Sequence, residues 1–168
     1  MSDTLSSLPV SVAALVTCKS VKRPDVIKTT MMEEKFNEST PQRPDADRPL
    51  DAPMVCIDLP HYIQKIRQEP SWNDSDRNAI TVFKTHDIRL VLVALHTGAA
   101  LTTHKAEGVI SLQVLEGRVR FHAENAGEVH VPAGQIVVLH EKIPHSVYAE
   151  EETVFLLTVT AGAASQHP

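Results

Sequence analysis

From residue 78 to residue 160 the chain alternates short apolar segments with short polar turns, and this pattern restricts its fold more than any other feature. The apolar segments are rich in Val, Ile and Leu, which favour strands over helices. The predicted strands are 79–84, 88–96, 109–115, 118–123, 128–131, 135–140, 146–149 and 153–160. Many short strands at regular spacing predict an all-β sandwich or barrel, and no alternation of strands with helices occurs.

The first 53 residues differ from this part in composition. They are rich in Pro, Ser, Thr, Asp and Lys, and the end of the segment has too few apolar side chains to build a core. We therefore predict a mostly disordered N-terminal leader over residues 1–53. Residues 54–77 are predicted to hold a short helix and a linker, since Asp58 can cap a helix that has Pro60 in its first turn. The barrel domain is predicted to cover residues 78–162.

Charge and hydropathy exclude two classes of partner. The net charge of −5 comes without a basic cluster, which argues against nucleic-acid binding. No run approaches the roughly 20 apolar residues of a membrane-spanning helix. Two cysteines do not demand an oxidising compartment. We predict a cytoplasmic protein that binds neither nucleic acid nor membranes.

Two segments of the barrel region carry glycine and histidine residues at regular spacing. The first runs from Gly98 through His104 to Gly117, and the second runs from Gly134 to His145. Together with the 16 residues between them, they resemble the two signature motifs of the cupin superfamily. The chain looks like a small single-domain bacterial cupin. The resemblance implies a cupin double-stranded β-helix, the RmlC-like jelly-roll barrel, preceded by the short helix and the leader.

The resemblance also bears on metal binding. Metal-binding cupins present three histidines and one glutamate from the inside of the barrel. His104 and His145 match the first and last ligand positions, whereas Ala106 stands at the second histidine position and Ile110 at the glutamate position. The site is therefore degenerate, and the expected cofactor is none or a divalent transition metal. A third donor would have to be recruited, and the candidates are His140, Glu107 and His96.

The strand over 109–115 indicates what surrounds the two histidines. If Ile110 faces inward, alternation places Leu112 and Val114 on the same side. An apolar interior suits a dry core or a small apolar or mixed ligand better than a hydrated metal. The predicted pocket consists of His104, His145, Ala106, Ile110, Leu112 and Val114.

Two functions follow from these observations, and the sequence leaves both open. The first is a small-molecule-binding or non-catalytic cupin barrel with a degenerate metal site. The second is a metal-dependent cupin enzyme of oxygenase or isomerase type, with an altered set of histidine ligands. No catalytic residue can be named, so the sequence does not decide whether the chain is an enzyme. Cupins often pair through their sheets, so the resemblance further implies a homodimer.

Overall fold

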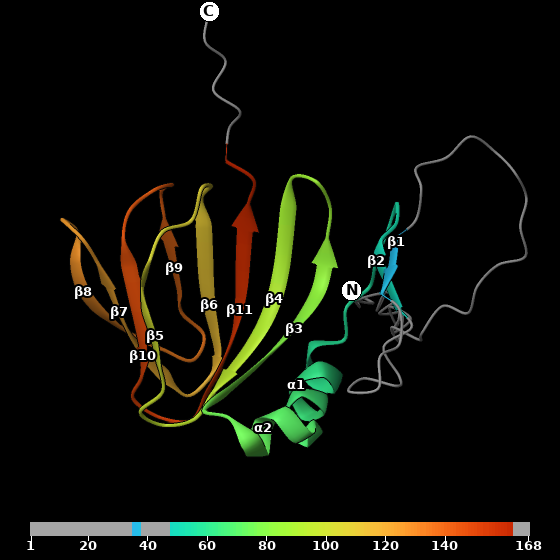
Figure 1. The fold of residues 1–168 in the computed structure, drawn as a ribbon, viewed down its shortest axis with the longest axis horizontal. Coiled ribbons are helices and arrows are strands. Elements are labelled where there is room, and N and C mark those ends of the chain that lie inside the picture. The colour runs from blue at the N-terminus through green and yellow to red at the C-terminus, as the bar shows by residue number, and fades with distance from the viewer. Residues whose placement is uncertain (1–34, 38–47, 163–168) are drawn as a thin grey trace, which may run out of the picture.

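The computed structural model describes residues 35–37 and 48–162 (Figure 1). Its helices are α1 (Leu59–Gln68) and α2 (Pro70–Asp74). Its strands are β1 (Lys35–Asn37), β2 (Arg48–Asp51), β3 (Arg77–Lys84), β4 (Ile88–Leu95), β5 (Ala100–His104), β6 (Ile110–Glu116), β7 (Arg118–Ala123), β8 (Gly127–Pro132), β9 (Ile136–Leu139), β10 (His145–Ala149) and β11 (Thr153–Thr160). Neither helix in this part of the chain has the length and apolar character needed to cross a membrane.

Nine strands form two antiparallel sheets with the orders β5-β10-β7-β8 and β3-β4-β11-β6-β9. Figure 1 shows the two sheets side by side, joined by connections at both ends. Strands from distant parts of the chain are interleaved, since β11 pairs with β4 on one side and with β6 on the other. This order is that of a jelly roll, so the predicted all-β double-stranded barrel is confirmed.

The core between the sheets is aliphatic and contains Phe121 and Phe155. Strand β6 shows how alternation builds it: Ile110, Leu112 and Val114 are buried, while residues 111 and 113 between them are not. The inward direction predicted for these three side chains is therefore confirmed. Burying one face of each strand against the opposite sheet is what holds the two sheets together.

The two helices cover the outer face of β3 and β4 (Figure 1). Strand β4 is buried on both sides, because Leu95 packs between the sheets while Leu92 packs under the helices with Ile66 and Trp72. The segment around Trp72 falls in the predicted linker, yet it is helical. This segment forms α2, whose first turn contains Pro70, and burial of the indole ring against the barrel stabilises it.

The predicted leader contains two short strands within its described part. Strands β1 and β2 pair in antiparallel fashion, and Figure 1 places β2 near β3. Residues 1–34 and 38–47 lie outside the described residues, so the disorder predicted for them stays a prediction. The predicted short helix is α1, the segment after it contains the additional helix α2, and the first strand of the barrel begins at Arg77.

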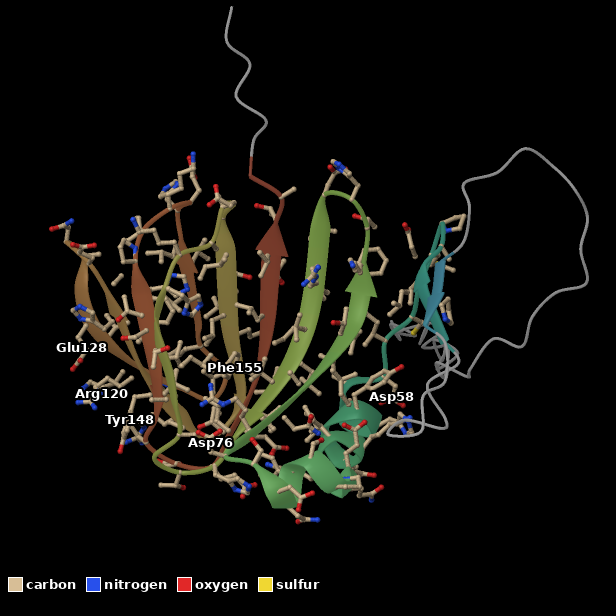
Figure 2. All side chains as sticks on the ribbon, viewed as in Figure 1. Asp58, Asp76, Arg120, Glu128, Tyr148 and Phe155 are labelled. Atoms are coloured by element: carbon tan, nitrogen blue, oxygen red, sulfur yellow. The ribbon has the colours of Figure 1, made fainter. Side chains whose placement is uncertain are left out.

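The start of α1 is capped by Asp58, which Figure 2 labels beside the helix. Its carboxylate accepts a hydrogen bond from His61 N at 3.1 Å. We expect Asp58→Ala to lower the free energy of unfolding by about 1 kcal/mol, as loss of an N-cap usually does. Asp58→Asn keeps a side-chain acceptor and should lose less than half as much. Urea denaturation measures both, and equal losses would contradict the capping role.

Candidate functional site

Two histidines meet at one end of the barrel. His104 ends β5, His145 begins β10, and the two residues are partners in the antiparallel pairing of these strands. Their ring centroids lie 4.4 Å apart. His145 is only 3% exposed, whereas His104 is exposed. The strand register therefore brings together one buried and one accessible imidazole, as the sequence motifs implied.

Each ring is oriented by the carbonyl group two residues before it. His104 Nδ1 lies 2.7 Å from the carbonyl oxygen of Thr102, and His145 Nδ1 lies 2.9 Å from that of Ile143. A carbonyl oxygen can only accept a hydrogen bond, so each Nδ1 donates and carries a proton. In the neutral ring the lone pair then resides on Nε2. The two strands thus present a matched pair of Nε2 acceptors.

The surroundings of His145 keep its ring neutral. Its imidazole stacks on Phe121, with ring centroids 5.6 Å apart and an interplanar angle of 12°. Burial lowers the pKa of His145 below the usual 6.5; the Ile143 carbonyl opposes this shift and the nearby His104 adds to it. Within the described residues, the hydrogen bond of the His145 ring is made by Nδ1, which leaves Nε2 for a ligand.

Acidification is expected to destabilise the protein through His145. Because the pKa of His145 is lowered on folding, the unfolded chain binds more protons between the folded pKa and about 6.5, and stability falls as the pH drops through this window. Urea denaturation at about pH 7.5 and about pH 5 measures the loss. This loss of stability should be smaller in His145→Gln than in wild type. His122→Gln, an exposed control on β7, should show the same loss as wild type. Equal losses in wild type and His145→Gln would contradict the lowered pKa of His145.

The four apolar residues predicted to line the pocket belong to the barrel core or pack against it. Ile110, Leu112 and Val114 are core residues, and Ala106 is half-buried beside them. Ile110 begins β6 and lies at the end of the barrel where β11 finishes, since it pairs with Val159. Leu112 and Val114 follow it into the barrel and are 1% and 0% exposed. The histidine pair therefore lies over a filled apolar interior.

The three candidate third donors have other surroundings. His96 stacks on Trp72 with ring centroids 3.6 Å apart, and its Nε2 lies 3.0 Å from the carbonyl oxygen of Trp72. His140 is highly exposed in the connection before β10, and Glu107 is exposed between β5 and β6. Over residues 49–162, no group of three or more His, Cys, Asp or Glu side chains could hold a metal ion. Two imidazoles fall short of the three protein ligands of a catalytic zinc site, so the donors present do not fit one.

Solved structures share this barrel. A conserved protein of unknown function from Streptococcus pyogenes matches with a TM-score of 0.55 and 23% identity, over 68% of this chain and 94% of that one. A cupin-2 domain protein from Shewanella frigidimarina matches with a TM-score of 0.50 and 15% identity, over 62% and 93% of the two chains. The chain has the cupin fold. An RmlC-like cupin from Desulfovibrio desulfuricans is 25% identical over 52% of this chain and 84% of its own, with a TM-score of 0.47.

These likenesses concern the cupin fold and leave the ligand to be inferred from the residues of this chain. No protein-family model and no curated protein matches the sequence.

Sequence reasoning missed two residues at the histidine end of the cupin barrel. Phe121 stacks on His145, and Arg89 lies near the start of β4. The strand alternation that placed Ile110 inward could have been applied to Arg89 as well.

Proposed function

We propose that this chain is a small-molecule-binding cupin whose ligand donates hydrogen bonds to Nε2 of His104 and His145. The observation that carries the proposal is the pair of Nδ1 bonds to the carbonyls of Thr102 and Ile143. Both bonds leave Nε2 as an acceptor, so a ligand with hydroxyl or N–H groups can satisfy the two rings together. Ala106 and Ile110 form the apolar floor of the histidine end, against which the carbon skeleton of such a ligand can pack.

A metal-dependent cupin enzyme is the second candidate, and the same two nitrogens favour it. A neutral imidazole whose Nδ1 is held by a carbonyl is a common metal ligand through Nε2. This enzyme would need a further donor, for which His140, Glu107 and His96 are the candidates. We favour binding over metal catalysis because none of the three joins the pair within the described residues.

Metal analysis separates the two candidates. Protein purified without a histidine tag is expected to contain no stoichiometric transition metal, and added Zn²⁺ or Mn²⁺ should leave its melting temperature unchanged. The matched variants are His104→Ala and His145→Ala, with His122→Ala as a control. A stoichiometric metal that both variants lose and the control keeps would overturn the binding proposal in favour of the enzyme.

Binding itself is followed through the histidine rings. On addition of glycerol or sorbitol at millimolar concentration, we expect saturable shifts of the His104 and His145 ring signals in NMR spectra. The signals of His122 and His130, which are exposed on the outer face, should stay in place. Shifts of the same size in all four rings, or none in the pair, would contradict a ligand site at His104 and His145.

We further propose that the chain forms a homodimer and is located in the cytoplasm. Exposed apolar side chains on the edge strand β9 support a homodimer, since Ile136 and Val138 are 56% and 62% exposed. Light scattering coupled to size-exclusion chromatography should give twice the chain mass. The mass of a monomer at all protein concentrations would contradict the proposed homodimer.

A further inference from the structure

Arg89 faces the inside of the barrel at the same end as the two histidines. Side chains of β4 alternate between the core that separates the sheets, reached by Val91, and the cluster under the helices, reached by Leu90. Arg89 shares the side of Val91 by this alternation. The pairing of β4 with β11 runs without a register shift and sets Arg89 beside Val159, which packs against the inner core.

Arg89, His104 and His145 lie at the same end of the barrel. Strand β4 begins next to Arg89 and β5, in the other sheet, ends at His104. The two strands are consecutive and antiparallel in direction, so the start of β4 lies at the end of the barrel where β5 finishes, opposite the helices (Figure 1). Packed sheets lie about 10 Å apart, a gap that one small molecule can span.

Arg89 differs from the other arginines of the described barrel and helices. Arg67, Arg77, Arg118 and Arg120 each have a carboxylate oxygen between 2.7 and 3.9 Å away. Arg89 is exposed and makes no ion pair with any described residue. A guanidinium group matches a carboxylate with two parallel hydrogen bonds, so this free fork is suited to an acidic ligand.

A second observation points to an anion at this end. Lys84 is the cross-strand partner of Arg89, and it too makes no ion pair within the described part of the chain. Like charges directly opposite each other on neighbouring strands are unfavourable. A bound anion would relieve this repulsion. Features that break a local rule in this way tend to lie at functional sites.

We propose that the ligand of this site is a small hydroxycarboxylate, with its carboxylate on Arg89 and its hydroxyl groups on Nε2 of His104 and His145. The inference rests on the binding function proposed above and adds the chemical class of the ligand. The two ends of the site require different groups, because a neutral Nε2 accepts hydrogen bonds and repels a carboxylate oxygen, whereas a guanidinium only donates.

The test compares acids with the matching polyols. Glycerate and glycerol share a three-carbon skeleton, gluconate and sorbitol share a six-carbon skeleton, and in each pair only the carboxylate differs. Titration followed through the His104 and His145 ring signals should show each acid binding about tenfold more tightly than its polyol, as a charge-assisted hydrogen bond permits. Arg89→Gln should remove this preference and leave polyol binding unchanged.

Arg120→Gln is the matched control, because it removes the same charge from the outer face, where Arg120 lies beside Tyr148 and Glu128 (Figure 2). It should keep the preference for acids. Equal binding of acid and polyol, or a preference for acids that survives in Arg89→Gln, would contradict a ligand carboxylate on Arg89. Either result would leave the proposed function intact. If none of the four compounds shifts the two rings, the proposed function fails and this inference fails with it.

Discussion

Gly117→Ala is expected to lower the free energy of unfolding by about 3 kcal/mol, which is the sum of two separate costs. Gly117 has φ of +76°, a left-handed backbone that costs a residue with a side chain about 1–2 kcal/mol. A Cβ atom there would also lie 2.2 Å from the carbonyl oxygen of Glu152 and 2.7 Å from Thr153 Oγ1. The neighbouring turn must move to admit it, and such overpacking costs about 1–3 kcal/mol.

Gly134→Ala separates these two costs. Gly134 has φ of +85°, yet a Cβ atom there would meet no described atom within 4 Å. Only the backbone cost applies, so the expected loss is about 1–2 kcal/mol. Urea denaturation of both variants gives the comparison. Equal losses at Gly117 and Gly134 would show that the close approach of the turn at Glu152 carries no cost, contrary to this account.

Phe155→Ala is the second large effect, with an expected loss of about 3–5 kcal/mol. Phe155 lies on β11, which is paired on both sides, and its side chain is 0% exposed in the core between the sheets (Figure 2). Truncating it removes buried apolar surface and leaves a cavity that both sheets enclose. Neither sheet can close this cavity without losing its own strand pairing.

The matched control is Phe83→Ala, at the same kind of residue on the edge strand β3, where the ring is half-buried. Its loss should be less than half that of Phe155→Ala. Thermal and urea denaturation measure both variants. A loss at Phe155 no larger than that at Phe83 would be incompatible with a core centred between the two sheets.

The barrel could be predicted because its determinants are local in the sequence. Gly98, Gly117 and Gly134 all have positive φ, so their spacing marks turns that few other residues can form. Alternation along β6 placed Ile110 inward, and the structure confirms that direction. Helix α2 was not predicted within the linker, because such a short helix is stabilised by burial of the Trp72 indole ring, which helix propensity does not report.

The site was only partly predictable. The motif spacing placed His104 and His145 together, as the strand register confirms. Their Nδ1 bonds go to backbone carbonyls, which every residue possesses, so no sequence pattern marks them. His96 packs on Trp72, which lies 24 positions earlier in the chain, and such a contact depends on how the helices pack on the barrel.

At the end of the cupin barrel, the Nδ1 bonds of His104 and His145 to backbone carbonyls leave Nε2 of both rings as the acceptor. Long-range ¹H–¹⁵N NMR of the histidine rings, recorded at neutral pH on protein without a histidine tag, tests it most directly. In the neutral form of each ring, His104 and His145 are both expected to carry the proton on Nδ1 and the lone pair on Nε2. A proton on Nε2 of either ring, or a charged His145, would contradict it.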